Sequence, residues 1–367
     1  MPPPTTIREL RADAYRVPAQ ARECDGTLCW DATELVVVHV STDAACGIGY
    51  SYTQALPAAA LLRDKLGPCL LGEDALALPQ LWRRMNEALR NLGRPGLGMM
   101  ALAAADIALW DLKAKLLGVP LAQQLGSARD AVPLYGSGGF TSYDDADLQA
   151  QLGNWARSGF RAVKMKVGSH PEDDARRVRI AREAVGGGVE LMVDANGAYD
   201  RVEALALAQD FAASRVCWLE EPVSSDDLDG LRWLSERVPA GMAVAAGEYA
   251  WDAGYFRAML EARAVGVLQA DATRCGYTGF LQAAALCEAF HCPLSAHCAP
   301  AIHVPLCAAV TPLRHLEYFH DHARLEPRLF DGVPEPDDGV LRPNTSVPGH
   351  GLSLKTEEAA RYALSTR

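Results

Sequence analysis

The chain has 367 residues, of which 49% are hydrophobic, and a formal net charge of −11. This length can form one large domain and a smaller one, and the apolar content can fill their cores. The negative charge disfavours nucleic acids and anionic membranes as partners. No apolar run reaches membrane-spanning length, and the first residues lack the apolar core of a signal peptide. We therefore expect a globular, cytoplasmic protein.

The first part of the chain, residues 1–130, is expected to form an α+β domain. Residues 33–40 and 47–53 predict two antiparallel strands joined by a turn. Gly118, with Val-Pro directly after it, predicts the end of the last helix of this region. Three helices are expected, over residues 57–66, 77–92 and 99–117.

From residue 131 to 324, short apolar segments alternate with amphipathic helices. The first segment covers residues 132–139, and each later one carries a polar residue at its C-terminal end: Lys166, Asp194, Glu220, Glu248, Asp271, His297 and Glu317. These residues are about 25 positions apart, which suits a strand, a helix and two loops per unit. An open doubly wound sheet has the same rhythm, but only a closed parallel (β/α) barrel brings all these strand ends around one point. We therefore predict a barrel.

Two lysines lie in the second predicted barrel strand. Lys164 and Lys166 alternate with apolar residues, which is the period-two pattern of a strand. In a buried parallel strand, both ammonium groups need negative partners. Directly after it, Ser169 and Glu172 predict a capping box, and Pro171 predicts the first turn of the next helix.

Three acidic residues, Asp194, Glu220 and Glu248, end consecutive strands, so the barrel should bring their carboxylates together. Such a cluster repels itself unless a cation neutralises it. Oxygen ligands from separate strands, with room for water and substrate, favour Mg²⁺ over zinc. The alternative, that each acid only caps the following helix, would have to hold for all three in succession.

Asp271 and His297 end neighbouring strands on the other side of the predicted barrel. A carboxylate beside an imidazole orients the ring and raises its basicity, which prepares it for proton transfer. Glu317 ends the last strand, between this pair and the lysines. We expect the other histidines of this region to be structural, namely His303, His315 and those in the run 320–322.

Ten cysteines are scattered through the chain without a Cys-x-x-Cys pair. In a cytoplasmic protein of this size, such residues generally pack as small buried side chains. We therefore expect free thiols rather than a structural disulfide.

Over nearly its whole length the chain resembles the mandelate racemase branch of the enolase superfamily. Residues 103–125 are similar to the helix and exit of that family's capping domain. The barrel motifs follow in family order: K-x-K at 164–166, D-A-N at 194–196, E-E-P at 220–222, G-E at 247–248, the aspartate of QADATRCG and the histidine of SAHCAP. The resemblance implies a (β/α)7β barrel, residues 131–324, with a cap built from residues 1–130 and the C-terminal tail 325–367.

The resemblance also implies a site that removes a proton beside a carboxylate. One Mg²⁺ would be held by the three carboxylates that end consecutive strands. Lys166 would be the base on one face of the substrate, with Lys164 lowering its pKa and supporting the developing enolate. The Asp271–His297 pair would act on the opposite face. Asn196 and Glu317 would hold the substrate.

In this family, loops of the cap close over the barrel mouth and select the substrate. Here they would be residues 16–30 and the stretch 50–56. Arg16 and Arg22 are expected to meet a distal carboxylate or sugar hydroxyls, with ordinary surface arginines as the alternative. Because residues 16–30 offer many hydrogen-bonding groups, we expect a hydroxylated substrate rather than an aromatic one.

The expected reaction is Mg²⁺-dependent dehydration of an acid sugar, an aldonate or aldarate, to a 2-keto-3-deoxy acid. Racemisation or epimerisation of an α-hydroxy acid remains an alternative, because the same two bases would serve it. A barrel that binds a ligand without catalysis is a further alternative. The expected partner is a small-molecule carboxylate, and the resemblance implies a homo-oligomer.

Overall fold

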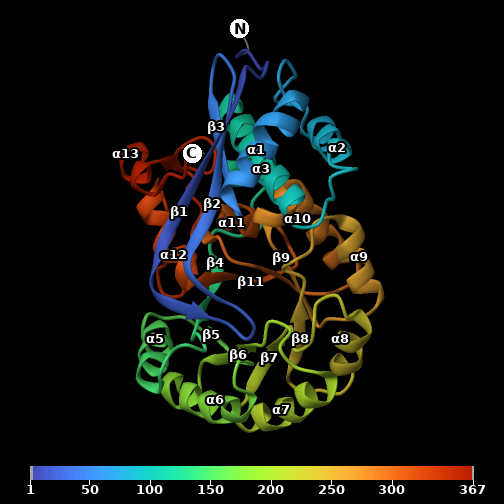
Figure 1. Cartoon of the computed structure of the whole chain (residues 1–367), viewed down its shortest axis with the longest axis vertical. Coiled ribbons are helices and arrows are strands. Elements are labelled where there is room, and N and C mark those ends of the chain that lie inside the picture. Colours follow the sequence, from blue (N-terminus) through green and yellow to red (C-terminus); the bar gives the residue numbers. More distant parts are fainter. Residues whose placement is uncertain (1–2, 366–367) are drawn as a thin grey trace.

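The computed structural model describes residues 3–365 and contains two main sheets. A three-stranded antiparallel sheet and its helices form the upper part of the molecule in Figure 1. A closed parallel barrel forms the lower part. The chain passes from the first to the second through a short helix, α4 (Leu121–Leu125).

The strand pair and the three helices predicted for the N-terminal region are present, although their first and last residues differ from the prediction. Helix α3 packs against β3 and α10 and is buried over most of its surface, which explains its apolar sequence. The helix predicted over 57–66 is split, since a π-helical turn follows α1. The elements are β1 (Glu9–Cys24), β2 (Cys29–Ser41), β3 (Cys46–Tyr52), α1 (Ala55–Leu61), η1 (Leu62–Leu66), η2 (Gly67–Cys69), α2 (Leu78–Ala88) and α3 (Leu97–Leu117).

The barrel consists of eight parallel strands, β4 to β11, and β11 pairs with β4 to close it. Seven helices connect the strands, so the predicted (β/α)7β fold is confirmed. The elements are β4 (Val132–Gly138), α5 (Asp145–Arg157), β5 (Ala162–Lys166), α6 (Pro171–Val185), β6 (Glu190–Asp194), α7 (Arg201–Ala213), β7 (Val216–Glu220), α8 (Leu228–Ser235), β8 (Ala243–Ala246), α9 (Ala253–Glu261), β9 (Val267–Ala270), α10 (Ala272–Ala289), β10 (Leu294–Ala296), α11 (Pro300–Ala309) and β11 (Leu313–Phe319).

The interior of the barrel is filled by large side chains below the strand ends. Tyr135, Met192 and Trp218 form one buried cluster there. Trp218 Nε1 donates a hydrogen bond of 2.8 Å to Glu220 Oε2, so this apolar layer also orients a carboxylate above it. The polar residues at the strand ends are therefore accessible only from the C-terminal mouth.

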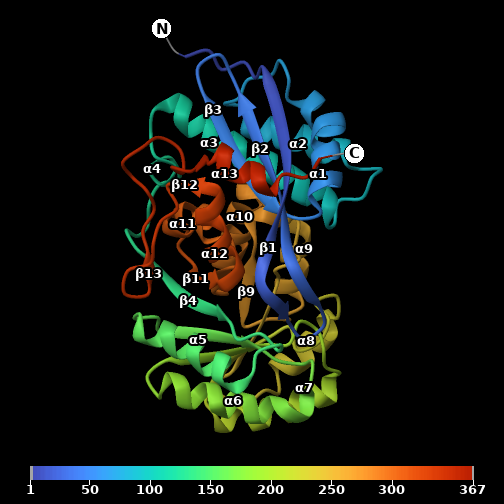
Figure 2. The same ribbon diagram turned by 60° about the vertical axis from the view of Figure 1, so that its left-hand side comes forward.

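After β11 the chain returns to the N-terminal sheet. Leu364 N donates to Ala14 O at 2.8 Å, which joins the tail to β1. Figure 2 shows the last helical segments lying beside this sheet. The elements of the tail are α12 (His320–Leu329), β12 (Phe330–Asp331), β13 (Val340–Leu341), β14 (Ser353–Leu354), α13 (Thr356–Ala359) and η3 (Ala360–Tyr362).

The prediction of a loop over residues 16–30 is wrong. Strands β1 and β2 run through this region and pair up to Cys24 and Cys29, with an irregularity between Pro18 and Glu23. The long hairpin reaches down from the N-terminal sheet to the barrel mouth (Figure 2). Its tip is held there by hydrogen bonds from Thr141 N to Cys24 O, at 2.8 Å, and from Thr141 Oγ1 to Asp25 O, at 2.7 Å.

The expectation that the cysteines are free is also wrong for two of the ten. Cys24 and Cys29 form a disulfide, because the hairpin register places them opposite each other in the last pair before the turn. The covalent link closes the turn of residues 25–28 and fixes the hairpin tip. Cys298, by contrast, is a free and buried thiol.

The capping box predicted at Ser169 and Glu172 does not form. Helix α6 begins at Pro171, as expected, but its N-cap residue is His170, which makes no side-chain cap hydrogen bond. Proline at the first position lacks an amide hydrogen, so one of the groups that a cap would satisfy is absent.

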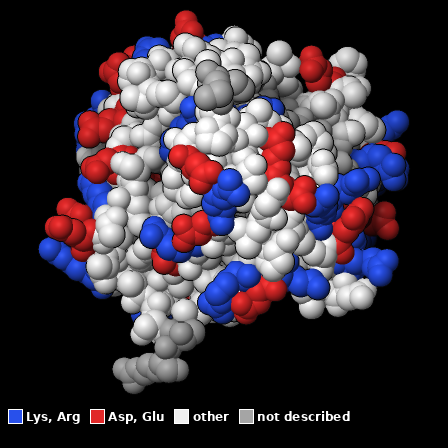
Figure 3. All heavy atoms as spheres, turned by 90° about the horizontal axis from the view of Figure 1, so that it is seen from above, with Lys and Arg blue, Asp and Glu red and all other residues white. Residues whose placement is uncertain are grey.

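Acidic and basic side chains lie interspersed on the face of the molecule seen in Figure 3, so neither sign dominates it. Within residues 3–365, none of the helices combines the length and apolarity that crossing a membrane requires.

Candidate active site

A cavity of about 490 Å³ lies at the C-terminal mouth of the barrel, under the β1–β2 hairpin. The barrel contributes polar residues from its strand ends, namely Lys166, Asn196, Glu248, Asp271, His297 and Glu317. The N-terminal sheet contributes Arg16, Trp30, Glu34 and Tyr52. The hairpin is therefore a wall of the cavity.

Three carboxylates converge beside this cavity. Asp194 and Glu220 end β6 and β7, and Glu248 follows β8 by two residues. One oxygen from each lies within 4.8 Å of the others, and all three residues are buried. Burial, and then the nearby Asp194, raise the pKa of Glu220 to about 8. Buried carboxylates this close fit a hard cation with oxygen ligands.

Lys164 lies below the cavity and is almost completely buried. Its Nζ is 2.6 Å from Glu220 Oε1 and 2.9 Å from Glu317 Oε1. Burial alone would lower the pKa of this lysine, but the two carboxylates raise it well above its usual value. The negative partners that a buried lysine needs are thus present, and Lys164 is a fixed positive charge.

Lys166 reaches the cavity, where its Nζ contacts Asp194 Oδ2 at 2.5 Å. Burial and the Lys164 ammonium both lower the pKa of Lys166, but Asp194 acts in the opposite direction and the net shift is upward. The protein charges alone therefore hold Lys166 protonated. A cation at the carboxylates would weaken the hold of Asp194 on this proton.

His297 and Asp271 form the predicted pair. His297 Nδ1 is 2.9 Å from Asp271 Oδ2, and His297 Nε2 is 3.1 Å from Glu248 Oε2. Burial lowers the pKa of His297, but the surrounding acids raise it well above its usual value. Around the closed barrel, two strands, β4 and β11, lie between this pair and β5 on one side, and three strands, β6 to β8, lie between them on the other.

Two further predicted residues also line the cavity. Glu317 Oε2 accepts a hydrogen bond of 3.0 Å from Cys298 N, while its other oxygen contacts Lys164. Asn196 has a left-handed backbone, with φ of 49°, and its Oδ1 is buried without a hydrogen-bond partner within residues 3–365. An orphaned acceptor in a cavity wall fits a ligand that carries donors.

The two arginines predicted on the hairpin lie in different places. Arg16 lines the cavity, but Asp31 already binds it at 2.8 Å. Arg22 is exposed and is not among the residues of the cavity wall. The irregular pairing between Pro18 and Glu23 separates the two positions along the hairpin.

Several cavity residues were not predicted. Arg274 lies over the ring of Tyr249, with its guanidinium carbon 4.8 Å from the ring centroid, and both line the cavity. Arg274 lies in the first turn of α10, three residues after Asp271, so its position at the mouth could have been predicted from the barrel. Cys298 and His322 follow no spacing signal.

The histidines expected to be structural differ in their surroundings. His303 Nε2 accepts a hydrogen bond of 2.7 Å from Ala272 N, and His315 Nδ1 is 2.9 Å from Ser295 Oγ. Both are buried. The second nitrogen of His303, Nδ1, is 3.0 Å from Ala299 O, whereas His315 Nε2 has no hydrogen-bond partner among the described residues. His322 also stacks on Tyr52, with ring centroids 3.5 Å apart, and it lines the cavity.

Two family models match the chain. The "Mandelate racemase / muconate lactonizing enzyme, N-terminal domain" model matches residues 26–126. The "Enolase C-terminal domain-like" model matches residues 147–359. A mandelate racemase/muconate lactonizing enzyme-like protein from Rubrobacter xylanophilus has a similar crystal structure, with a TM-score of 0.95 and 51% identity, covering 98% of this chain and 100% of that one.

Curated relatives include enzymes that act on sugar acids. A 3,6-anhydro-alpha-L-galactonate cycloisomerase from Streptomyces coelicolor is 34% identical over 98% of this chain and 99% of its own. L-talarate/galactarate dehydratase from Salmonella typhimurium is 31% identical over 88% of this chain and 80% of its own. A crystal structure of that dehydratase holds Mg and L-lyxarohydroxamate, with a TM-score of 0.90 and 26% identity, covering 98% of this chain and 93% of that one.

Proposed function

Because the chain belongs to the mandelate racemase/muconate lactonizing enzyme family of the enolase superfamily, we propose that it removes the α-proton of a sugar acid and expels an oxygen from the β-carbon. Dehydration of an aldonate or aldarate to a 2-keto-3-deoxy acid is the reaction we favour. The observation that carries the proposal is the carboxylate cluster of Asp194, Glu220 and Glu248, with a lysine and a histidine on different sides of it.

The first step needs a base beside the α-carbon. A proton next to a carboxylate is very weakly acidic, since its removal places two negative charges on one group. Mg²⁺ held by the three carboxylates would supply positive charge to the substrate carboxylate. Lys166, once it has released its own proton to solvent, takes the α-proton on one face. Lys164 supplies a fixed positive charge from below the cavity, and Glu317 in its protonated form donates a hydrogen bond to the enediolate.

The second step needs an acid beside the β-carbon. His297, held by Asp271, is charged in the protein and can donate from Nε2 to the departing oxygen. If that oxygen belongs to a hydroxyl group, water leaves and the reaction is a dehydration. If instead the histidine returns a proton to the α-carbon from the opposite face, the outcome is racemisation or epimerisation.

The cycloisomerase relative favours a second candidate reaction. In a 3,6-anhydro sugar acid, the oxygen on the β-carbon is part of a ring. The same α-proton removal would then open the ring, and no water would be lost. The relative's 34% identity over nearly the full length of both chains is the reason to test this substrate class.

The cavity supports a hydroxylated substrate. Asn196 offers an acceptor that no described residue satisfies, and Glu34 and Asp25 add further polar groups from the hairpin. Arg274 is a positive group in the wall whose only ion pair in the described chain is a long one, 3.8 Å to Asp271. We propose that Arg274, rather than Arg22, meets the distal end of the substrate.

A substrate screen tests the proposal. Aldonates, aldarates, uronates and 3,6-anhydro sugar acids are incubated with the Mg²⁺-loaded protein, and 2-keto products are measured with semicarbazide. Keto product from one or two acids is expected, because sites that bind hydroxyls discriminate strongly among them. Exchange or inversion at the α-carbon without keto product, on any substrate, would instead support the racemase. No turnover and no exchange across the panel would contradict the proposal.

We expect Asp271→Asn to weaken the histidine side of the site alone. The change should lower kcat by about 10²- to 10⁴-fold, because an amide neither orients His297 nor stabilises its charged form. Solvent-deuterium exchange at the α-carbon measures each face separately, and exchange through Lys166 should persist. Asp252→Asn is the matched control, since Asp252 caps α9 as Asp271 caps α10 but lies outside the cavity wall. Equal losses in both variants would show that only the helix cap matters.

Gly26→Ala should impair substrate binding by displacing the hairpin tip. A Cβ at Gly26 would lie 2.2 Å from Ala195 O and 2.6 Å from Val167 O, so the tip cannot stay docked on the barrel. We expect KM to rise several-fold with a small change in melting temperature. Gly188→Ala is the control, because a Cβ there meets nothing within 4 Å. An unchanged KM in Gly26→Ala would mean that the hairpin does not contribute to substrate binding.

A further inference from the structure

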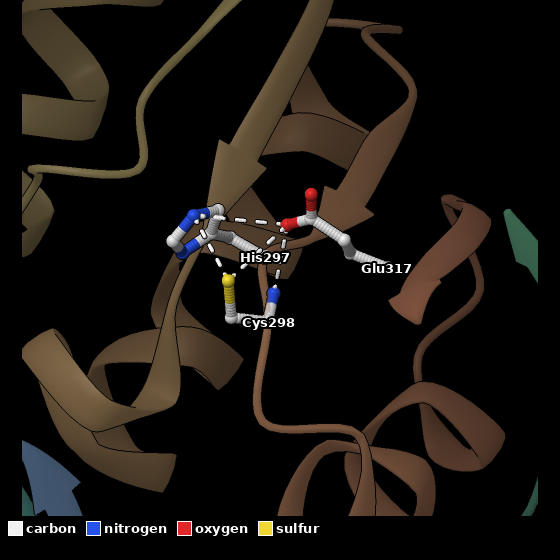
Figure 4. A group of neighbouring side chains, drawn as sticks. All are labelled: His297, Cys298 and Glu317. Atoms are coloured by element: carbon white, nitrogen blue, oxygen red, sulfur yellow. Dashed lines mark hydrogen bonds and ion pairs between the residues drawn. The ribbon is translucent and has the colours of Figure 1, made fainter. Parts of the chain in front are cut away.

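We propose that His297, Cys298 and Glu317 form a second metal site, which binds a thiophilic divalent cation such as Zn²⁺ and thereby blocks His297. The three side chains point toward one another at the barrel mouth (Figure 4). They supply one nitrogen, one sulfur and one oxygen. This donor set is typical of zinc and unlike the all-oxygen set of the neighbouring carboxylate cluster.

The distances among the three donor atoms fit one face of a tetrahedron. Cys298 Sγ is 3.2 Å from His297 Nε2 and 3.4 Å from Glu317 Oε2, and Nε2 and Oε2 are 3.7 Å apart. Ordinary zinc bond lengths place tetrahedral ligand atoms about 3.3–3.6 Å apart. Each pair therefore needs to move by only a few tenths of an ångström, and the cavity leaves the fourth position to water.

The other atoms of these side chains are already held. His297 Nδ1 contacts Asp271 Oδ2 at 2.9 Å, which is the carboxylate–histidine arrangement that orients imidazole ligands on zinc. Glu317 Oε1 contacts Lys164 Nζ at 2.9 Å. Consequently His297 Nε2 and Glu317 Oε2 both face Cys298 Sγ, and a cation there would compete with Glu248 Oε2, which is 3.1 Å from the same Nε2.

The backbone around Cys298 holds the thiol in place. Cys298 and Ala299 both have left-handed conformations, with φ of 53° and 39°, which are unfavourable for residues other than glycine. Hydrogen bonds from Cys298 N to Glu317 Oε2 and from Ala299 N to His322 Nδ1 maintain this turn. Cys298 is only 3% exposed, but it lines the cavity. A cation can therefore reach its thiol from the barrel mouth.

Binding at this site would exchange two protons for the metal. The Cys298 thiol and Nε2 of the charged His297 each release a proton to solvent as their bonds to zinc form, so two protons leave for each cation bound, and no electron is transferred. His297 Nε2 is then occupied and cannot donate to or accept from a substrate. This inhibitory consequence rests on the proposed function, whereas the binding itself does not.

Cobalt(II) tests the binding directly in the Mg²⁺-saturated protein. One equivalent should produce the thiolate-to-cobalt absorption band, which should be absent from Cys298→Ser and Cys298→Ala. Cys292→Ser and Cys46→Ser should keep the band, and they control for the buried Cys287–Cys292 pair and for an exposed thiol. Melting curves of all variants verify folding. Absence of the band from the unsubstituted protein, or its persistence in both Cys298 variants, would overturn the metal site.

Zinc inhibition tests the consequence. Each variant is compared with its own zinc-free activity at saturating Mg²⁺. The zinc concentration for half inhibition should rise at least about tenfold in Cys298→Ser, since losing a direct ligand costs no less than losing an outer partner. Cobalt binding without any zinc inhibition would leave the metal site standing and contradict the role of His297. Equal inhibition with and without Cys298, with no cobalt band, would locate zinc at the carboxylates and refute the proposal.

Discussion

Lys166→Ala is expected to lower kcat by about three orders of magnitude or more, because it removes the base that takes the α-proton. Lys166 lies in the cavity wall, whereas the neighbouring Lys164 is below it and bound to two carboxylates. Lys164 therefore cannot take over the role of the missing base. The substrate should still bind, so KM should change far less than kcat.

Solvent-deuterium exchange at the α-carbon separates this loss from a general defect. In Lys166→Ala, exchange on the lysine face should disappear while exchange through His297 remains measurable. Lys65→Ala, a change on the exposed surface of the N-terminal region, should match the unsubstituted protein. If exchange from both faces survives in Lys166→Ala, the assignment of the base is wrong. Melting curves at saturating Mg²⁺ must agree among the three proteins.

The barrel could be predicted because its signals repeat. Each parallel strand is buried on both sides and short, so it reads as an apolar run that ends in one polar residue. Lys166 and Asp194 even pair in register across β5 and β6, as expected for successive strand ends. A polar side chain at the C-terminal end of a barrel strand points to the barrel mouth, because the interior below it is filled.

The hairpin could not be predicted from the same kind of signal. Strand β1 projects beyond the core, so both of its faces are exposed or half-buried over residues 18–22, and apolar alternation is lost. Pro18 interrupts it further. The Cys24–Cys29 disulfide depends on the register of this hairpin, which spacing alone does not reveal. Residues that recur at the same place in every strand–helix unit can be recognised in the sequence, whereas the contacts of a single hairpin cannot.

In the candidate active site too, the residues that follow the repeat could be predicted and the others could not. Residues at or near strand ends were predicted in place because they follow the repeat. Cys298 lies two residues beyond the end of β10, in a turn whose left-handed backbone has no sequence signature in a cysteine. The pKa of Lys166 was expected to be lowered by Lys164. Lys164 does lower the pKa of Lys166, and burial lowers it further. Asp194, which the prediction did not consider, raises this pKa by more, so the net shift is upward.

Removal of Mg²⁺ is expected to abolish activity and lower the melting temperature, and Glu220→Gln should do both permanently. Glu220 holds a proton up to about pH 8 in the folded protein, against about 4.5 when unfolded, because burial and Asp194 disfavour its charge. The folded state therefore binds more protons between these values, and this residue makes the free energy of unfolding fall as pH rises through that window. A cation that replaces the proton removes the penalty.

Thermal melting with and without a chelator measures this effect at pH 8. At a hundredfold excess over Kd, Mg²⁺ should add about 3 kcal/mol to the free energy of unfolding, a rise of a few degrees. Glu221→Gln is the matched control. Burial, and then Glu248, raise the pKa of Glu221 well above its usual value, so glutamine resembles the form it already has. Its Mg²⁺ response should persist, whereas that of Glu220→Gln should vanish. If all three proteins melt alike with Mg²⁺ and with chelator, the carboxylate cluster does not bind the cation, and the acids at these strand ends serve only the electrostatics of Lys164 and Lys166.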